Sequence, residues 1–278
     1  MAEAFRLSDY LARIGFQGTA RADLATLSAI HAAHVDAIPF EGLDPYLGRE
    51  VKLDLASVQE KILDRRRGGY CFEQNAMLRA ALEQIGFAVT GLAARVRWMA
   101  LPDSPLGPRT HMVLRVDLPE GPFLVDVGFG ACLIDRPIPL VAGVEHRTDM
   151  GTFRLTETAG LFALSARQRT AWRPAYVFTL EPAQQSDYEL GNYFTSTSPR
   201  ALFTGTLVME RLARDRRYRL IDRRFVTELR DGEPAAEREL ASAGELAQVL
   251  EEVFRITAPV PAAQIFARTQ ARVAAPGP

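Results

Sequence analysis

The sequence predicts an α+β protein, and three observations lead to this prediction. Residues 1–86 repeat apolar side chains at helical spacing between capping residues and glycines. From residue 87 onward, short runs rich in β-branched and aromatic residues alternate with Pro and Gly, which is typical of an antiparallel sheet or small barrel. Residues 185–278 mix strand-like runs with amphipathic helical stretches. We therefore expect a helical, a sheet and a mixed segment, joined near residues 86 and 184.

Composition and charge exclude several classes of protein. The 278 residues are 47% hydrophobic and 24% charged, with a net charge of −1, so no global field would attract nucleic acid or a membrane surface. Two cysteines make no secreted disulfide framework. Residues 1–10 lack the apolar centre of a signal peptide, and no apolar run is long enough to span a bilayer. We expect a cytoplasmic protein with no nucleic-acid or membrane partner; a homodimer is left open.

Four helices are predicted in residues 1–86, the first ending near Gly15 and the last near Gly86. The residues expected to cap or open them are Ser8, Asp23, Asp54 and Cys71. His31 and His34 lie on the second helix, and no carboxylate or cysteine cluster accompanies them. We therefore expect ordinary buried or surface histidines there, with no metal site.

The later elements are predicted from alternation and turn residues. Strands are expected at 89–98, 110–116, 123–127, 153–158, 161–166, 172–180, 206–212, 218–221 and 225–229. Helices are expected at 182–190, 246–253 and 262–273. The second and third strands flank a turn at 118–121 and so form a hairpin.

The sequence from Arg67 to Asn75 contains the first candidate for chemistry. Two glycines precede Cys71, and good helix formers follow it, so this cysteine is expected in the first turn of a helix. The helix N-terminus favours an anion, which favours the thiolate form of the cysteine. Cys71 is then either a nucleophile or a small buried residue at a loop–helix junction. As the residues before a nucleophile, Gly68 and Gly69 would leave space for a thioester to approach.

The predicted hairpin brings a histidine and an aspartate together. Pairing about its turn places His111 opposite Asp126, or within one pair of it, where side chains lie about 5 Å apart. The pair is either an ordinary cross-strand contact or an imidazole oriented by a carboxylate. Together with Cys71, the pair has the composition that a thiol nucleophile needs. The order Cys, His, Asp is that of papain-like and transglutaminase-like folds.

Five segments make a resemblance specific. They are 38–41 (Ile-Pro-Phe-Glu), 67–75 (Arg-Gly-Gly-Tyr-Cys-Phe-Glu-Gln-Asn), 110–111 (Thr-His), 126–130 (Asp-Val-Gly-Phe-Gly) and 193–199 (Tyr-Phe-Thr-Ser-Thr-Ser-Pro). In order and spacing they resemble the motifs of arylamine N-acetyltransferases, and the last is typical of bacterial members. The resemblance covers at least residues 5–205.

The resemblance implies a fold and an activity. A helical domain at 1–86 would carry Cys71, a β-barrel domain at 87–184 would carry His111 and Asp126, and an α/β lid would follow at 185–278, around a cysteine-protease-like core. Acetyl-CoA would be the cosubstrate, with no metal. Arylamines or arylhydrazines would accept the acetyl group on nitrogen, and N-hydroxyarylamines on oxygen.

Candidate binding residues follow from the resemblance, for Thr110, and from the residue types themselves for the others. Those expected beside the cofactor are Thr110, Gly128, Phe129 and Gly130. Those expected around the acceptor are Phe40, Phe129 and Phe203. The glycines lack side chains, so their backbone N–H groups could approach a pyrophosphate; otherwise they only make a turn, and the phenylalanines only pack the core.

Two further residues of the matching motifs are Arg67 and Glu41, and we predict that they pair to hold the loop before Cys71. Alternatively, Arg67 contacts CoA phosphates. Cys132 has no base in the sequence around it, and we expect an inert, packed residue. Gly42 departs from the family pattern, which usually has Asn after Pro-Phe-Glu.

Other activities use the same three residues. An amide synthase that closes a macrocycle from a carrier-bound thioester shares the triad. A papain-like or transglutaminase-like thiol hydrolase shares its order, and a non-catalytic binding module could retain it unused. The sequence favours acetyl transfer.

Overall fold

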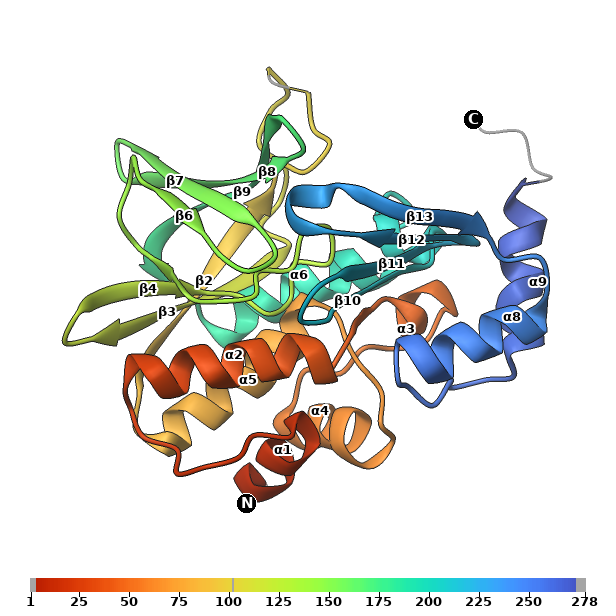
Figure 1. Ribbon diagram of the computed structural model, residues 1–278, viewed down its shortest axis with the longest axis horizontal. Helices are drawn as coiled ribbons and strands as arrows, with labels where there is room; N and C mark the ends of the chain where they lie inside the picture. Colours follow the sequence, from red (N-terminus) through yellow and green to blue (C-terminus); the bar gives the residue numbers. More distant parts are fainter. Residues whose placement is uncertain (1–3, 102, 274–278) are drawn as a thin grey trace.

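The structure is a computed structural model that describes residues 4–101 and 103–273. The helices before residue 87 are α1 (Leu7–Ile14), α2 (Leu24–Ala37), α3 (Leu43–Tyr46), α4 (Leu55–Gln59) with a π-helical continuation η1 (Glu60–Asp64), and α5 (Cys71–Ile85). Figure 1 shows α1, α2, α4 and α5 gathered beneath the sheets. The helical first segment is therefore confirmed.

Two of the predicted caps are confirmed and one is wrong. The carboxylates of Asp23 and Asp54 accept hydrogen bonds from the backbone N–H groups three residues on, and so cap α2 and α4. Ser8 does not cap α1, because that helix begins at Leu7 and Arg6 occupies the capping position. The Arg6 backbone N–H donates to Gln59 Oε1 at 2.6 Å, so a tertiary contact, rather than a local cap, accompanies this helix start.

The middle of the chain forms one antiparallel sheet of eight strands that curls into a nearly closed barrel (Figure 1). Its spatial order is β5-β4-β3-β2-β9-β8-β7-β6. The strands are β2 (Ala88–Val96), β3 (His111–Leu118), β4 (Gly121–Val125), β5 (Ile138–Pro139), β6 (Glu145–Arg147), β7 (Thr152–Thr158), β8 (Leu161–Gln168) and β9 (Ala171–Pro182). The two short strands β5 and β6 were not expected from the sequence.

The β3–β4 hairpin has the predicted turn. Leu118 faces Gly121 across it, and the ladder ends where Leu114 faces Val125. Asp126 therefore follows the end of β4. Continued by the same register, Asp126 would face Val113, two residues along from His111, so the predicted partners are diagonal neighbours rather than a directly facing pair.

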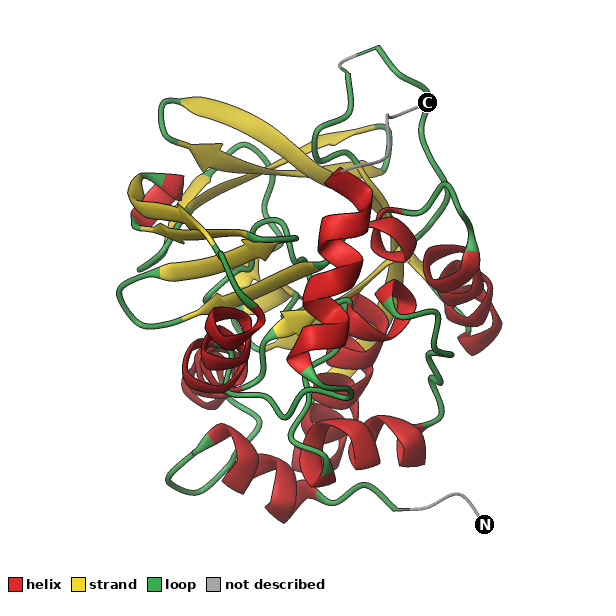
Figure 2. Ribbon diagram, turned by 90° about the vertical axis from the view of Figure 1, so that its right-hand side faces the viewer, coloured by secondary structure: helices red, strands yellow, loops and turns green. Residues whose placement is uncertain are grey.

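The last segment supplies four strands of a five-stranded antiparallel sheet with helices around it (Figure 2), and the fifth strand comes from the first segment. The spatial order is β1-β10-β11-β12-β13. Its strands are β1 (Phe40–Glu41), β10 (Val208–Leu212), β11 (Arg217–Ile221), β12 (Arg224–Glu228) and β13 (Pro234–Glu239). The helices are α6 (Gln185–Thr197), α7 (Leu202–Gly205), α8 (Ala243–Gln248) continuing as the π-helix η3 (Val249–Val253), and α9 (Ala262–Val273); a 3-10 turn, η2 (Arg230–Gly232), precedes β13.

One expectation about this segment was wrong, and two strands of the sheet were not predicted. The helix expected at 182–190 runs instead from Gln185 to Thr197, because β9 continues to Pro182. Strand β13 was missed because all six of its residues are exposed, so no apolar alternation marks it. Strand β1 was missed because two residues carry no periodicity, and only its partner β10 makes them a strand.

The main core joins the helices to the barrel. Leu78 and Leu82 of α5 pack in one buried cluster with Met112, Leu114 and Val116 of β3. This packing places the start of α5 beside the start of β3. Among the described residues, no helix is long and apolar enough to cross a membrane. The division into domains at 1–86, 87–184 and 185–278 remains a prediction, and β1 crosses it by joining the C-terminal sheet.

Candidate active site

Cys71 is the first residue of α5 and is almost fully buried. Its Sγ lies 3.6 Å from the carbonyl oxygen of Thr110, the residue before β3. Tyr70 in front of it is extended, and its backbone N–H donates to Glu73 Oε2 at 3.0 Å. The helix start predicted for this cysteine is confirmed, and the thiol faces the first residues of β3.

His111 and Asp126 form a buried pair behind the thiol. Nε2 of His111 lies 2.7 Å from Oδ2 of Asp126, and because an ionised carboxylate only accepts, Nε2 carries the hydrogen. This leaves Nδ1 available to the Cys71 side chain, the other group that interacts with the imidazole. Burial lowers the pKa of His111, but the charge and hydrogen bond of Asp126 raise it by more, with a smaller contribution from Cys71. The resulting pKa is about 10.

Asp126 is held by a residue to which we assigned no role. Nδ2 of Asn75 donates to Asp126 Oδ1 at 2.9 Å and to the Met112 carbonyl at 2.7 Å. Oδ1 of Asn75 accepts from the Val127 backbone N–H at 3.1 Å. Asn75 lies four residues after Cys71 and so on the same face of α5. This spacing of four residues from the candidate nucleophile is the feature of the sequence that could have indicated a role for Asn75.

Aromatic side chains enclose the imidazole. The ring of Phe129 meets that of His111 at 5.1 Å between centroids, and the ring of Tyr176 lies at 4.8 Å. Tyr176 comes from β9, on the opposite edge of β2 from β3. The sequence did not indicate Tyr176, because its proximity to His111 depends on the pairing of β9 with β2, two strands far apart in the sequence.

The glycines of the two motifs are required by close packing. A Cβ at Gly128 would lie 2.6 Å from the Cα of Cys71, and one at Gly130 would lie 2.2 Å from the Phe40 ring. A Cβ at Gly68 would lie 2.0 Å from the Pro39 carbonyl oxygen. The expectation that Gly68 and Gly69 leave space for a thioester is therefore wrong, because that space is filled by Pro39, Glu41 and Glu73.

The predicted binding residues surround one cavity of about 670 Å³. It is lined by Phe40, Cys71, Thr110, His111, Gly128, Phe129, Gly130 and Phe203. Asp126 lies behind this wall, fully buried. The cavity wall also includes Trp98, Met99 and three arginines, Arg200, Arg219 and Arg224, to which we had assigned no role.

Phe203 is placed in this wall by two aromatic rings and a glycine. Its ring lies 5.6 Å from that of Phe40 and 5.9 Å from that of Tyr70, between centroids. A Cβ at Gly42 would lie 3.1 Å from Phe203. The departure from the family pattern at Gly42 therefore faces the cavity wall, where any side chain would press on Phe203.

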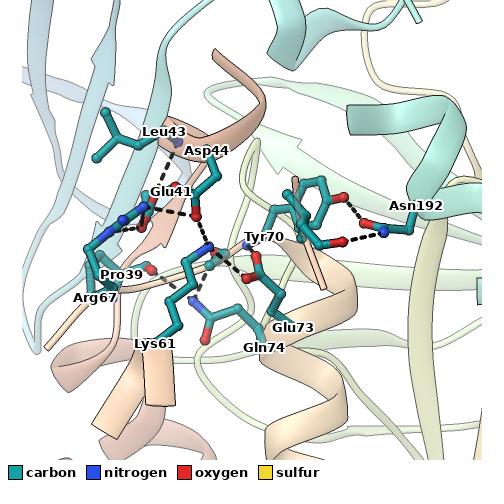
Figure 3. Close-up of polar contacts among 12 residues, drawn as sticks. Pro39, Glu41, Leu43, Asp44, Lys61, Arg67, Tyr70, Glu73, Gln74 and Asn192 are labelled. Atoms are coloured by element: carbon teal, nitrogen blue, oxygen red, sulfur yellow. Dashed lines mark hydrogen bonds and ion pairs between the residues drawn. The ribbon is translucent and has the colours of Figure 1, made fainter. Parts of the chain in front are cut away.

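A chain of buried ion pairs supports the segment before Cys71 (Figure 3). Nε of Arg67 donates to Glu41 at 2.7 Å, which confirms the predicted pair, and Nη2 reaches Asp44 at 3.2 Å. Nζ of Lys61 lies 2.7 Å from Asp44 and 2.6 Å from Glu73. Because Glu73 also accepts the N–H of Tyr70, the chain of charges extends from β1 to the start of α5.

Three further hydrogen bonds tie the same segment to the rest of the fold. Nε2 of Gln74 donates to the Pro39 carbonyl at 2.7 Å, which ties α5 to the residue before β1. The Tyr70 hydroxyl donates to Asn192 of α6, whose amide donates to the Val51 carbonyl at 2.8 Å (Figure 3). Residues from three separate parts of the chain therefore fix the backbone beside Cys71.

The side chains of His31, His34 and Cys132 are buried and contribute to packing and hydrogen bonding in the core. Nε2 of His31 meets the Ile134 carbonyl at 3.0 Å, and His34 lies between Tyr10 and Gln74. Across the described part of the chain, no group of three or more His, Cys, Asp and Glu residues could bind a metal. Burial raises the pKa of the Cys132 thiol to about 11, which fits the inert residue expected there.

A buried thiol at a helix start, with an imidazole and a carboxylate behind it, is the arrangement of enzymes that carry an acyl group on cysteine. A family model described as N-acetyltransferase matches residues 23–262. An arylamine N-acetyltransferase of Mycolicibacterium smegmatis is 45% identical over 220 residues, 78% of this chain and 80% of the relative. The chain belongs to the arylamine N-acetyltransferase family and is an acyltransferase.

Two further relatives bear on the activity. An arylamine N-acetyltransferase / N-hydroxyarylamine O-acetyltransferase of Salmonella typhimurium is 39% identical over 203 residues, covering 73% of this chain and 72% of the relative. The arylamine N-acetyltransferase of Mycobacterium marinum, solved in complex with CoA, superposes with a TM-score of 0.87 at 35% identity. That match covers 96% of this chain and 98% of the other.

Proposed function

We propose that this protein transfers an acetyl group from acetyl-CoA to the nitrogen of arylamines or arylhydrazines, through a thioester on Cys71. The observation that carries the proposal is the His111–Asp126 pair, 2.7 Å apart and buried, beside a cysteine in an aromatic-walled cavity. Cys71, His111 and Asp126 are the proposed catalytic residues.

In the first half of the reaction, Nδ1 of His111 takes the proton of the Cys71 thiol. The thiolate attacks the acetyl-CoA carbonyl, and the backbone N–H of Cys71, at the helix start, is our candidate donor to the oxyanion. The bond to the CoA sulfur breaks, and the His111 imidazolium gives its proton to the departing CoA thiolate, so that the imidazole is neutral again. Asp126 accepts the other imidazole N–H and stabilises the imidazolium.

In the second half, an amine attacks the acetyl-Cys71 thioester and His111 accepts its proton. The C–N bond forms as the C–S bond breaks, and His111 returns the proton to the sulfur, which regenerates the thiol. For an N-hydroxyarylamine the hydroxyl oxygen would take the place of the nitrogen, as the name of the Salmonella relative indicates for that protein.

The binding residues are proposals of the same kind. Thr110, Phe129 and Gly130 are assigned to the cofactor, and Phe40, Phe129 and Phe203 to a flat acceptor, because all five line the cavity. Gly128 is the weakest of the cofactor residues, since its N–H already donates to Asp126 Oδ1 at 2.8 Å.

Mass spectrometry of the acetylated protein tests this function. After incubation with acetyl-CoA, we expect one acetyl group on the tryptic peptide containing Cys71, released by added arylamine. Cys71→Ala should remain unmodified and inactive, whereas Cys132→Ala is the matched control and should retain both adduct and turnover. An unmodified wild-type protein would contradict the proposal and favour the amide-synthase or hydrolase alternatives.

We further propose that the protein works in the cytoplasm, where thiols stay reduced. Cys71 and Cys132 are both free in the structure. A homodimer is likewise a proposal, and light scattering on the purified protein would establish the assembly.

A further inference from the structure

The segment that follows Asp126 is held by the C-terminal sheet. Residues 128–134 contain no strand, yet Phe129 of this loop packs on the imidazole of His111 and Gly130 packs on Phe40. Leu133 near its end is fully buried. Its backbone N–H and C=O therefore require partners that a sheet would otherwise supply.

An ion pair supplies both partners. Oε1 of Glu210, on β10, accepts the Leu133 N–H at 2.8 Å. Nη2 of Arg217, on β11, donates to the Leu133 carbonyl at 3.2 Å. Nε of Arg217 also lies 3.3 Å from the same Glu210 oxygen, so the two side chains form one unit around a single residue of the loop.

This unit is costly to bury, which suggests that it has a role beyond stability. Glu210 is 0% exposed and Arg217 is 1% exposed. Replacing buried ion pairs by apolar side chains is often neutral or stabilising, so their presence is weak support for a purely stabilising role. Arg219 and Glu228 complete the cluster, with 2.9 Å between Nη1 and Oε1, and neither has a hydrogen bond to Leu133 among those of the described residues.

We propose that Glu210 and Arg217 are positioning residues for acetyl transfer. By holding both backbone groups of Leu133, they fix the 128–134 loop, and through it the position of Phe129 against His111 and of Gly130 against Phe40. The C-terminal sheet thereby shapes the wall of the active-site cavity nearest the imidazole. This inference rests on the proposed function, because it assigns the effect to the acetyl-transfer step.

A matched pair of variants tests the proposal. Glu210→Met and Glu228→Met each remove one carboxylate from the same buried cluster, but only Glu210→Met leaves the Leu133 N–H without its acceptor. We expect Glu210→Met to lower kcat/KM for the arylamine at least tenfold in protein that remains folded, and Glu228→Met to lower it less than threefold. Glu210→Gln keeps an acceptor oxygen and should recover most of the loss.

Amide hydrogen exchange gives a readout that does not depend on activity. The Leu133 amide should be strongly protected in the wild type and in Glu228→Met, and should exchange at least tenfold faster in Glu210→Met. Equal exchange at Leu133, or equal loss of kcat/KM, in the two Met variants would overturn the proposal. If Glu210→Met fails to fold, Glu210→Leu and Glu228→Leu carry the same comparison, because leucine also lacks an acceptor, with faster exchange expected in the first only.

The two proposals fail in different ways. Absence of acetyl-Cys71 in the wild type would contradict the function and leave the exchange result intact. Normal acetylation with no difference between the Glu210 and Glu228 variants would contradict only the positioning role.

Discussion

A single amide side chain, Asn75, organises the carboxylate of the candidate site. It donates to Asp126 and accepts from Val127, so it fixes both the side chain and the backbone at the end of β4. Asp126 also accepts from Gly128 and His111. With three donors, the carboxylate is stabilised in its charged form despite full burial, and its pKa is lowered.

The charge on Asp126 sets the titration of His111. Of the four histidines, His111 alone should titrate well above neutrality, with a pKa of about 10, whereas burial lowers the pKa values of His31, His34 and His146. NMR of the imidazole carbons across a pH series measures this directly. A wild-type protein in which all four titrate at or below neutrality would contradict the assigned pair.

Asp126→Asn is the control for this titration. Without the carboxylate, burial dominates and the His111 pKa should fall below its ordinary value of about 6.5. In the wild type the folded pKa is raised, so the stabilisation from the charged imidazole is complete below about pH 6.5 and is lost as pH rises through about 10. Denaturant unfolding of both proteins across this range should show their difference shrinking toward alkaline pH.

At the scale of elements, a chain of buried ion pairs holds the start of α5. The chain from Glu41 through Arg67, Asp44 and Lys61 reaches Glu73, which caps the N–H before Cys71. Gly68 and Gly69 are required there because a Cβ at either position would lie within 3 Å of neighbouring atoms. The sequence predicted one link of this chain, Arg67 with Glu41, and missed Asp44 and Lys61, which have no motif to mark them.

Two neighbouring arginines should differ sharply in their effect on stability. Arg67 is 4% exposed and pairs with buried carboxylates, so Arg67→Ala should lower the free energy of unfolding by about 3–5 kcal/mol. Arg65, with 65% of its side chain exposed, pairs with surface Glu60, and Arg65→Ala should change the free energy of unfolding by less than about 0.5 kcal/mol. Denaturant titration measures both, and similar values would refute a structural role for the Arg67 pair.

At the scale of the whole molecule, each of the three segments makes buried contacts with the others. Strand β1 comes from the helical part of the sequence and pairs with β10 of the C-terminal sheet. Leu133 of the barrel region is bound by Glu210 and Arg217 of that same sheet. The main core joins α5 to β3. No segment is therefore expected to keep its native arrangement when another unfolds.

This connectivity predicts a single cooperative unfolding transition. Trp98 and Trp172 are the two tryptophans of the chain and both belong to the barrel region, so their fluorescence reports on it. Far-ultraviolet circular dichroism reports mainly on the helices. The two signals should change at the same denaturant concentration. Separate midpoints would instead support three independently stable domains at 1–86, 87–184 and 185–278.

Sequence patterns were sufficient where the signal is local. The Asp23 and Asp54 caps, the Cys71 helix start and the turn at 118–121 depend on residues next to one another, and each was predicted. Residues that line the cavity were identified through motif resemblance, and they do converge there. Strand β13 and the full length of α6 were not predicted, because exposed strands and helix boundaries carry little periodic signal.

By itself the sequence determined the class of fold, the family and the identity of the cysteine, histidine and aspartate, because periodicity, capping and motif spacing are written in neighbouring residues. Only the tertiary structure decided what holds them. Three contacts do so: Asn75 with Asp126, Tyr176 with His111, and Leu133 with both Glu210 and Arg217. Each joins residues separated by 51 to 84 positions in the sequence. The physical reason is that a buried polar group must find its partner in space, and chain folding, rather than local spacing, determines which partner lies within reach.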